Sequence, residues 1–535
     1  MKKKLFYILF AGTSLVACKK DVLNTAPLDE YSNSSLWTSK ADANAALTGC
    51  YSGWELGDNI LYDDCISDNG FDQFPWEGYE TFASGLATPS NPGVNKYSYT
   101  TIQRCNWFLE NVDKVSATLL DNTLRDRMKG EARFLRAYRY FVLSQVYGDV
   151  PLTLTNITTA EANTITRTPK ATVVDFVLKE LAEIAPALPV SYSGSDIGRI
   201  TRGAALALKA RVELFNAKYT DCITTCQLLM TAPFSYSLYP NYEGLFRPQN
   251  SNNKEVILDV QYLQNDNAEW VLGAMLPNSY GGWSSMAPTQ SLVDAYETKN
   301  GKEIQNDPSY DPLQPYKNRD PRLDASIIRP GLYHNGGYFD PLSQGSSDLV
   351  GNNNASPTGY NWKKYVADLD DYNNSAYGTD IWNTGGSIIV IRYAEILLAY
   401  AEAKIEANQI DASVYAAINL VRQRPTVNMP VVTNALYPDQ ASLRTLIRRE
   451  RRVELAGEGL RWYDIQRWKI GSTVLNGNVK GCLNGSVDPS NGNLTLIPNS
   501  NFVAGSRSFA DKNYLWPIPQ KERDINKELS QNQGY

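Results

Sequence analysis

The sequence predicts a mostly α-helical protein in which tetratricopeptide-like helix pairs form a scaffold and a loop-rich face with short strands covers it. Two stretches, residues 201–231 and 392–424, each read as two helices, and they are closed by Pro233 and Pro425. Each pair spans about 34 residues, which is the period of tetratricopeptide repeats. Between the pairs, residues 234–387 are dominated by Asn, Gly, Pro, Tyr and Trp, and helical periodicity nearly vanishes.

The chain begins with a predicted lipoprotein signal peptide, residues 1–17. Lys2 opens a basic start, an apolar run follows at residues 5–10, and small residues precede Cys18. This end is similar to the lipobox of bacterial lipoproteins, and the similarity implies that Cys18 becomes the mature N-terminus and carries acyl chains. Such chains anchor a soluble body to a bilayer surface. Residues 388–403, the most apolar later stretch, contain charged residues and are not predicted to span a membrane.

Composition excludes several classes of function. The formal net charge is -6, which disfavours nucleic acid as a partner. His334 is the only histidine, so a His-rich zinc site is excluded, as is a Ser-His-Asp triad without this residue. Six cysteines follow Cys18; they are scattered along the chain, so buried free thiols are at least as well supported as disulfides.

Hydrophobic periodicity places the scaffold at about residues 39–233 and 388–468. The predicted helices are residues 39–56, 101–115, 124–147, 172–188, 201–217, 219–231, 392–408 and 412–424. Residues 57–99 are expected to be irregular. The loop-rich insert, about residues 234–387, should contain a strand at 255–262 and a short helix at 290–297. The C-terminal strap, residues 513–535, is expected to lie extended because it contains Pro517 and Pro519.

A charged helix within residues 441–468 is central to the prediction. Glu450, Glu454 and Glu458 recur every four residues, so they share one face and repel one another. Arg451 can partly answer Glu454, and at least one glutamate should meet an arginine of a neighbouring helix. Glycines at positions 457 and 459 should interrupt the helix. Interleaved tryptophans and tyrosine favour burial over the alternative of a solvated charged helix.

The ordered motifs of the chain resemble the SusD/RagB family of outer-membrane lipoproteins. The motifs are Cys18 in its lipobox, GEARFLRAYRYFVLSQVYGDVPL from residue 130, TRGAALALKARVELF from 201, NRDPRL from 318, IRYAEILLAYAEA from 391, ERRVELAGEGLRWYDIQRW from 450 and LWPIPQKERDINKELSQNQGY from 515. The resemblance implies four helix pairs with a decorated opposite side. It also implies nutrient binding without catalysis, and docking as a lid on a SusC-like TonB-dependent transporter at the cell exterior.

An oligosaccharide ligand would need flat aromatic rings for its C–H faces and polar side chains for its hydroxyls. Three segments supply such residues. Residues 62–82 contain the first candidate group, Asp68, Asn69, Phe71, Trp76 and Tyr79. Residues 270–283 contain the second, Trp270, Tyr280 and Trp283, and the third is Trp362, Tyr365 and Trp382. Local packing explains any single aromatic better, but the set predicts at least one exposed aromatic platform.

Other interpretations stay open at this point. The aromatic face serves a peptide or another nutrient as well as a glycan, and a secreted helical glycosidase is a less favoured alternative. Asp63 and Asp64 are a conceivable glycosidase pair, although carboxylate separation is not readable from sequence. The neighbouring acids Asp368, Asp370 and Asp371 are a candidate for structural calcium, but without the EF-hand pattern solvated loop acids are favoured. No cofactor is predicted.

Overall fold

The computed structural model describes residues 36–366 and 380–535. The predicted lipidation site Cys18 and the candidate calcium ligands Asp368, Asp370 and Asp371 lie outside the described residues. Their assignments therefore stay predictions.

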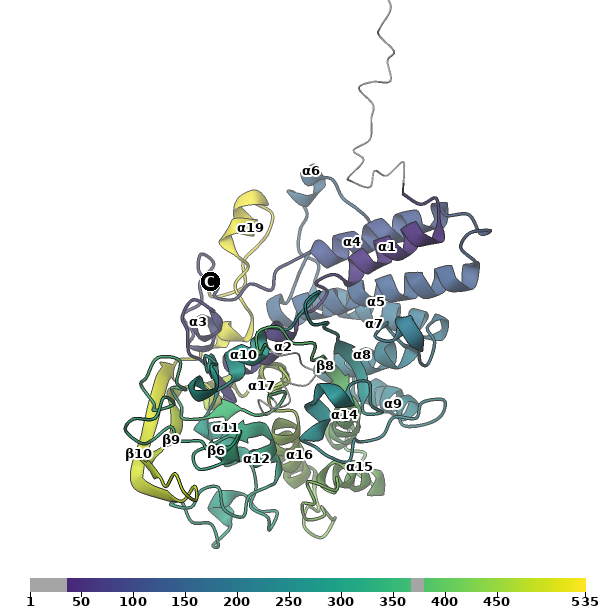
Figure 1. The fold of residues 1–535 in the computed structure, drawn as a ribbon. Helices are drawn as coiled ribbons and strands as arrows, with labels where there is room; N and C mark the ends of the chain where they lie inside the picture. Colours follow the sequence, from purple (N-terminus) through teal and green to yellow (C-terminus); the bar gives the residue numbers. More distant parts are fainter. Residues whose placement is uncertain (1–35, 367–379) are drawn as a thin grey trace, which may run out of the picture.

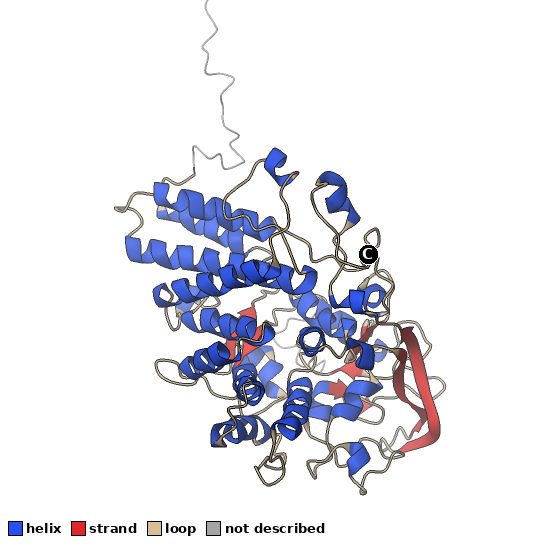
Figure 2. Ribbon diagram, turned by 180° about the vertical axis from the view of Figure 1, so that it is seen from behind, coloured by secondary structure: helices blue, strands red, loops and turns tan. Residues whose placement is uncertain are grey.

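The long helices pack against one another in chain order, as the sequence predicts. They are α1 (Lys40–Tyr51), α4 (Thr100–Asn111), α5 (Asn122–Tyr147), α7 (Lys170–Ile184), α8 (Arg202–Phe215), α9 (Tyr219–Leu229), α14 (Tyr393–Glu406), α15 (Ala412–Arg422), α16 (Gln440–Glu454) and α17 (Arg461–Trp468). Each helix contacts the next from α4 to α9, and α14 then packs on α9, α15 and α16. Figures 1 and 2 show the helical array at one side of the molecule, with the strands concentrated elsewhere. The predicted mostly α-helical fold with helix pairs is confirmed.

Side-chain caps set where several scaffold helices begin. The Asp121 carboxylate accepts a hydrogen bond from Leu124 N at the start of α5, and the Thr201 hydroxyl accepts one from Ala204 N at the start of α8. Such caps satisfy backbone N–H groups that have no partner within the helix. Observed helix ends therefore differ from the predicted ones by only a few residues.

Two short two-stranded sheets connect the insert to the rest of the chain, and two others lie within the insert. The connecting pairs are β1 (Gly70–Asp72) with β3 (Met286–Pro288) and β2 (Val256–Val260) with β8 (Ile388–Arg392); the pairs within the insert are β4 (Ile327–Ile328) with β7 (Asn361–Trp362) and β5 (Tyr333–His334) with β6 (Gly337–Tyr338), and all of these pairs are antiparallel. The predicted strand at 255–262 is β2, and its partner β8 runs directly into α14. Three short helices lie in the same region: α10 (Val271–Met275), α11 (Gln290–Ala295) and α12 (Arg322–Ser326).

Three segments differ from the sequence prediction. Residues 57–99 are not wholly irregular, because they form α2 (Gly57–Tyr62), β1 and α3 (Tyr79–Ala83). The strap is not extended throughout, since Pro519 caps α19 (Gln520–Ile525). A long hairpin of β9 (Gly477–Val487) and β10 (Leu494–Arg507) was not predicted. Two further short helices are α6 (Thr159–Ala162) and α18 (Gly471–Val474).

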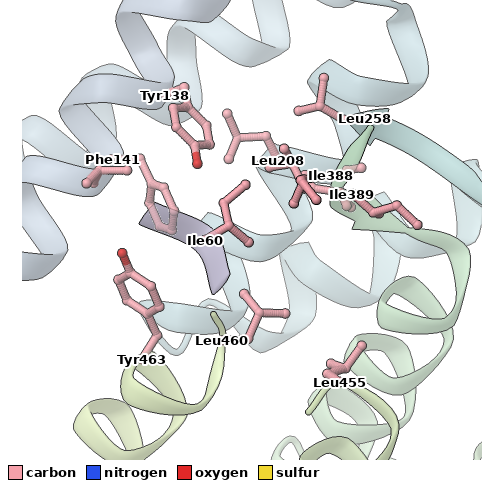
Figure 3. Packing of buried hydrophobic residues seen from close by; sticks show 14 of the residues in the cluster. Ile60, Tyr138, Phe141, Leu208, Leu258, Ile388, Ile389, Leu455, Leu460 and Tyr463 are labelled. Carbon is pink, nitrogen blue, oxygen red and sulfur yellow. The ribbon is translucent and has the colours of Figure 1, made fainter. Parts of the chain in front are cut away.

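A single cluster of buried apolar side chains runs through scaffold, insert and strap. Figure 3 shows Tyr138 of α5, Leu208 of α8 and Leu258 of β2 converging with Ile388 of β8 and Tyr463 of α17. Burying each large apolar side chain contributes about 1.5–3 kcal/mol. Because insert and scaffold residues share this core, the loop-rich face is fixed to the helices by apolar packing as well as by strand pairing.

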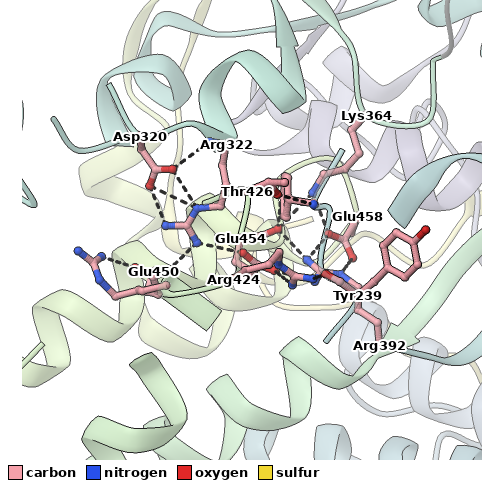
Figure 4. Close-up of polar contacts among 12 residues, drawn as sticks. Tyr239, Asp320, Arg322, Lys364, Arg392, Arg424, Thr426, Glu450, Glu454 and Glu458 are labelled. Atoms are coloured by element: carbon pink, nitrogen blue, oxygen red, sulfur yellow. Dashed lines mark hydrogen bonds and ion pairs between the residues drawn. The ribbon is translucent and has the colours of Figure 1, made fainter. Parts of the chain in front are cut away.

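The glutamates of residues 450–458 lie in a buried network of ion pairs (Figure 4). Glu450 pairs with Arg322 at 2.6 Å and with Arg422 at 2.7 Å. Glu458 pairs with Arg392 at 2.8 Å and with Lys364 at 2.9 Å. The prediction that these carboxylates meet arginines from other elements is confirmed, and a solvated helix is excluded.

Arg451 does not form an ion pair with Glu454, contrary to the sequence prediction. Its guanidinium lies 3.3 Å from Glu402 of α14 and 3.3 Å from Asp464 of α17. Glu454 instead pairs with three arginines from outside its own helix. Arg451 is three residues away from Glu454 on the same helix. Arginines of packed neighbouring segments already occupy the buried space beside the Glu454 carboxylate, so Arg451 does not pair with it.

The cysteines of the described chain are buried free thiols, at positions 50, 65, 105, 222, 226 and 482. This outcome agrees with the reading that scattered cysteines need not pair. None of the described helices has the length and apolar character needed to cross a membrane.

Candidate ligand-binding site

Strand pairing brings two of the aromatic segments side by side. In the β1–β3 ladder, Gly70 lies opposite Pro288 and Asp72 opposite Met286. The ladder continues one step further, because Gln73 N donates a hydrogen bond of 2.8 Å to Ser285 O. The loop that follows β1 and the loop that precedes β3 therefore leave the sheet at the same end.

Five aromatic rings of the three segments are exposed or half-buried, and we call this set the aromatic platform, defined as Phe74, Trp76, Trp270, Trp283 and Trp382. Trp76 is 79% exposed and stacks on Phe74, with ring centroids 4.7 Å apart. Trp283 is 42% exposed and its ring lies 4.4 Å from that of Trp382. Trp270 is 40% exposed. The platform combines all three aromatic segments predicted from the sequence.

Backbone bonds attach the third segment to the second. Glu269 and Thr384 exchange both of their backbone hydrogen bonds, at 2.8 and 3.1 Å. This bridge lies next to Trp270 in one segment and close to Trp382 in the other. The ring of Trp382 also covers Gly273, where an added Cβ would lie 2.6 Å from the indole. One side of the Trp382 ring therefore packs against Gly273, while part of the ring surface stays exposed.

A tight turn places Tyr280 and Trp283. Gly281 has φ of 80°, a conformation that favours glycine, and a Cβ at Gly282 would lie 2.2 Å from Leu276 O. Tyr280 is half-buried; its hydroxyl donates to His334 O at 3.0 Å. The predicted exposure of Trp283 is observed, while Tyr280 lies at the edge of the platform and also braces the β5 strand.

Four predicted contact residues are enclosed by the fold. Asp68 lies between Arg452 and Arg461, at 3.0 and 2.7 Å. Burial raises the pKa of Asp68, but the two guanidinium groups outweigh it and lower the pKa to about 2. Asn69 accepts a hydrogen bond from Arg452 Nε at 2.8 Å. These charged and amide groups are thus already engaged within the protein.

The aromatic members of the same group are also buried. Phe71 packs under Gly505 of β10, and Tyr79 stacks on Tyr62 with centroids 4.8 Å apart. A surface ligand does not reach the buried rings of Phe71 and Tyr79 without a rearrangement of the loop. We therefore retain Trp76, Trp270, Tyr280 and Trp283 as candidate contacts, and assign the enclosed residues to the support of the loop.

The third predicted group divides between core and surface. Trp362 and Tyr365 are buried, with Trp362 packed against Gly457, and only Trp382 joins the platform. Sequence alone did not distinguish these rings because all three share the same Asn- and Gly-rich surroundings.

A carboxyl group supports the Trp76 loop from inside. Asp72 accepts hydrogen bonds from Phe74 N at 3.3 Å and Tyr79 N at 3.0 Å. Burial, together with the neighbouring Glu77, raises the pKa of Asp72 to about 9. Glu77, which accepts a hydrogen bond from the Tyr62 hydroxyl at 2.9 Å, was not singled out from the sequence.

The conceivable glycosidase pair does not lie at the platform. Lys96 Nζ lies 2.6 Å from a carboxylate oxygen of Asp63, and Asp64 accepts a hydrogen bond from Gly457 N. Both side chains are buried under the segment between α16 and α17. Because a glycosidase needs two carboxyl groups that flank the bond to be cleaved, these two residues give the catalytic alternative no support. Within the described ranges, no group of three His, Cys, Asp or Glu side chains is arranged to hold a metal ion.

Comparison with known families covers most of the chain. Residues 246–535 match the family model described as "SusD family", and residues 28–214 match the model described as "Starch-binding associating with outer membrane". Among curated proteins, the chain is similar to SusD-like protein P2 of Formosa agariphila, at 25% identity over 559 residues and with all of both chains covered.

Solved structures agree with this relationship. A SusD-like carbohydrate binding protein from Bacteroides fragilis has a TM-score of 0.83 and 33% identity, and the match covers 92% of this chain and 99% of that one. A laminarin binding SusD-like protein has a TM-score of 0.69 and 22% identity, over 93% and 100% of the two chains. At 22% identity, the similarity to the laminarin binding protein shows only that the two chains share a fold.

Proposed function

This chain belongs to the SusD family, and from that premise we propose that it captures an oligosaccharide on the aromatic platform. We further propose that it delivers the glycan to a SusC-like TonB-dependent transporter, while Cys18 carries the lipid anchor that holds it at the outer surface of the outer membrane. The protein would act by binding alone, without catalysis. The alternative within the same family is a lid for peptides or another nutrient.

The observation that carries the proposal is the exposure of large aromatic rings on loops that the fold holds rigidly. Trp76 exposes 79% of its surface although indole is largely apolar. Clustered exposed apolar surface on a soluble protein commonly marks a binding site. Flat rings accept the C–H faces of a sugar, and neighbouring polar groups such as Tyr280 orient its hydroxyls.

The names of related proteins support a glycan over a peptide. One matching family is described as starch-binding, the Bacteroides fragilis relative is described as carbohydrate binding, and a more distant neighbour is described as binding laminarin. Of these ligands, starch and laminarin are neutral glucans. The net charge of -6 on this chain is compatible with a neutral ligand and unfavourable for a strongly anionic one.

Single substitutions test the platform. The variants Trp76→Ala and Trp283→Ala, in the full-length chain purified in detergent, should each lower affinity for the bound glycan about tenfold, which corresponds to about 1.4 kcal/mol. Binding is measured by calorimetry after a screen of malto-oligosaccharides, laminari-oligosaccharides and peptides. Leu228→Ala is the matched control, because Leu228 is 50% exposed on α9, away from the platform.

Unchanged glycan affinity in both tryptophan variants would remove the platform from the site. Binding of peptides in place of glycans would favour the alternative nutrient, and release of reducing ends during incubation would contradict binding without catalysis. Cys18→Ala should release the protein from membranes, and co-purification with a large β-barrel protein would support the transporter partner.

A further inference from the structure

A second hollow lies outside the aromatic platform, where the start of α4 meets the C-terminal strap. It has a volume of about 350 Å³ and is lined by the start of α4, by residues 151–165 and by the C-terminal strap around α19. This volume is within the range of ligand-binding pockets. The sequence analysis singled out none of its residues as contacts.

The lining combines aromatic rings with polar groups. Tyr97 packs edge-to-face against Tyr99, with centroids 5.6 Å apart, and the Tyr99 hydroxyl donates to Pro151 O at 2.9 Å. Burial raises the pKa of Tyr97 to about 12, so its hydroxyl stays neutral at physiological pH. The side chains of Gln103 and Asn163 line the hollow and make no hydrogen bond to a described residue. Such a lining suits a ligand with both C–H faces and hydroxyls.

The walls of this hollow are braced by other side chains. Asn106 Nδ2 donates to Thr153 O and Thr155 O, at 3.1 and 3.0 Å. Asn526 Nδ2 holds the opposite end of the same loop, with bonds of 3.0 and 2.8 Å to the carbonyl groups of Ala162 and Ile165. A pre-formed wall lowers the conformational entropy that binding would otherwise lose.

A shallower hollow of about 520 Å³ continues from the first toward the Trp76 loop. Ile525 lines both hollows, and Pro92 and Gln520 line the outer one. Gly78, two residues after Trp76, packs against the backbone of Gly93, which directly follows Pro92. Figures 1 and 2 show α3, α19 and the C-terminus on the same side of the molecule. The loop that carries Trp76 therefore adjoins the wall of the outer hollow.

We propose that the two hollows form an outer subsite that continues the aromatic platform, so that the preferred ligand is an extended, neutral oligosaccharide. This inference rests on the proposed function and deepens it. Among the residues that the structure describes, Glu522 is the only charged side chain that lines the inner hollow, and Lys521 and Asp524 line the outer one. Since the described lining carries two acidic side chains and one lysine, a sulfated or uronic chain meets a net negative charge there.

Chain length is the variable that tests the subsite. The probes are malto-oligosaccharides and laminari-oligosaccharides of defined length, from the trisaccharide upward, titrated into the full-length protein in detergent. Affinity should rise at least tenfold between the trisaccharide and the longest member of the series that binds. Gln103→Trp fills the inner hollow and Gln520→Trp fills the outer one; both should abolish this rise and leave trisaccharide affinity unchanged.

The controls separate this inference from the proposed function. Gln227→Trp places the same ring on the exposed surface of α9 and should keep the length dependence. Trp76→Ala should weaken trisaccharides and longer chains alike. If affinity still rises with chain length in both Gln103→Trp and Gln520→Trp, the proposed outer subsite is wrong. It is also wrong if affinity does not rise with chain length in the unmodified protein. Neither result contradicts binding at the aromatic platform. Failure of every glycan to bind the unmodified protein overturns both.

Discussion

Glu454 shows at the residue scale how the charged helix α16 is held. Its carboxylate lies 2.9 Å from Arg322, 2.7 Å from Arg392 and 2.9 Å from Arg424. Burial alone raises the pKa of Glu454, but Arg392, Arg424 and Arg322 together hold it well below its ordinary value. One carboxylate thus forms ion pairs with arginines from three separate segments of the chain.

Removing this carboxylate should be strongly destabilising. Glu454→Ala leaves three guanidinium groups buried beside one another without their shared anion, and the expected loss is about 3–5 kcal/mol in the free energy of unfolding. Denaturant-induced unfolding, followed by tryptophan fluorescence, measures the change.

Glu528→Ala is the matched control for Glu454→Ala. Glu528 is exposed, so its removal should change the free energy of unfolding by no more than about 0.5 kcal/mol. Equal stability of the two variants would show that the buried network contributes nothing beyond a surface charge.

Individual residues also differ in whether the sequence alone predicts their surroundings. The i, i+4 spacing of Glu450 and Glu454 made their shared face of α16 predictable, because that geometry is local. Glu458 does not share this face as predicted, because α16 ends at Glu454. The exposure of Trp76 and the enclosure of Asp68 were not predictable. Asp68 is 393 residues away in sequence from its partner Arg461. The residues around Asp68 in the sequence therefore do not indicate that it forms an ion pair with a distant arginine.

The break between α16 and α17 is decided by two glycines at the scale of the element. Gly457 has φ of 75° and Gly459 has φ of 71°. A Cβ at Gly459 would lie 2.4 Å from Ile60 O, so the turn also lets the backbone of α2 approach closely. The interruption was predictable from composition, whereas its contact with α2 was not.

Gly459→Ala should therefore cost at least about 2 kcal/mol, since an alanine in the left-handed region is strained and its Cβ meets a backbone oxygen. Gly49→Ala is the matched control, because Gly49 lies inside α1 with nothing within 4 Å of an added Cβ. That control should stabilise the protein by about 0.5–1 kcal/mol. Thermal unfolding by calorimetry compares the two. A neutral Gly459→Ala would show that the backbone relaxes without cost.

The hairpin of β9 and β10 is the element that sequence reasoning missed. Its strands contain several register shifts, and many of its side chains are exposed, including Ile497 and Val503. Irregular pairing of this kind blurs the period-two alternation by which strands are recognised. Helices that pack one face on a continuous core, such as α5 and α8, retain a clear period and were placed within a few residues.

Titration of buried carboxyl groups acts on the stability of the whole molecule. Burial raises the pKa of Asp63 to about 6, and those of Asp64 and Glu269 to about 7. The pKa of Asp72 is raised in the same direction, to about 9. Between pH 4 and these values the native protein binds more protons than the unfolded chain, so its stability falls as pH rises.

We expect the thermal midpoint to be highest near pH 4, to fall toward pH 8, and to fall again below about pH 4 as Asp68 loses its charge. Each raised group contributes up to about 1.4 kcal/mol per pH unit within its window. Differential scanning calorimetry across pH measures this profile. Glu269→Gln should flatten the fall between pH 5 and 7, and a midpoint that rises from pH 5 to 8 would contradict the assignment.

The sequence by itself determined the helix pairs, the position of the loop-rich insert, the buried charged helix and the family resemblance. These features depend on periodicity, capping, glycine positions and ordered motifs, all of which are local. Only the tertiary structure decided which aromatic rings form the platform, which arginines meet α16, and that the strap and α4 enclose a second hollow. Those outcomes depend on contacts between residues far apart in the chain, where packing and desolvation select one partner among many with the same local pattern.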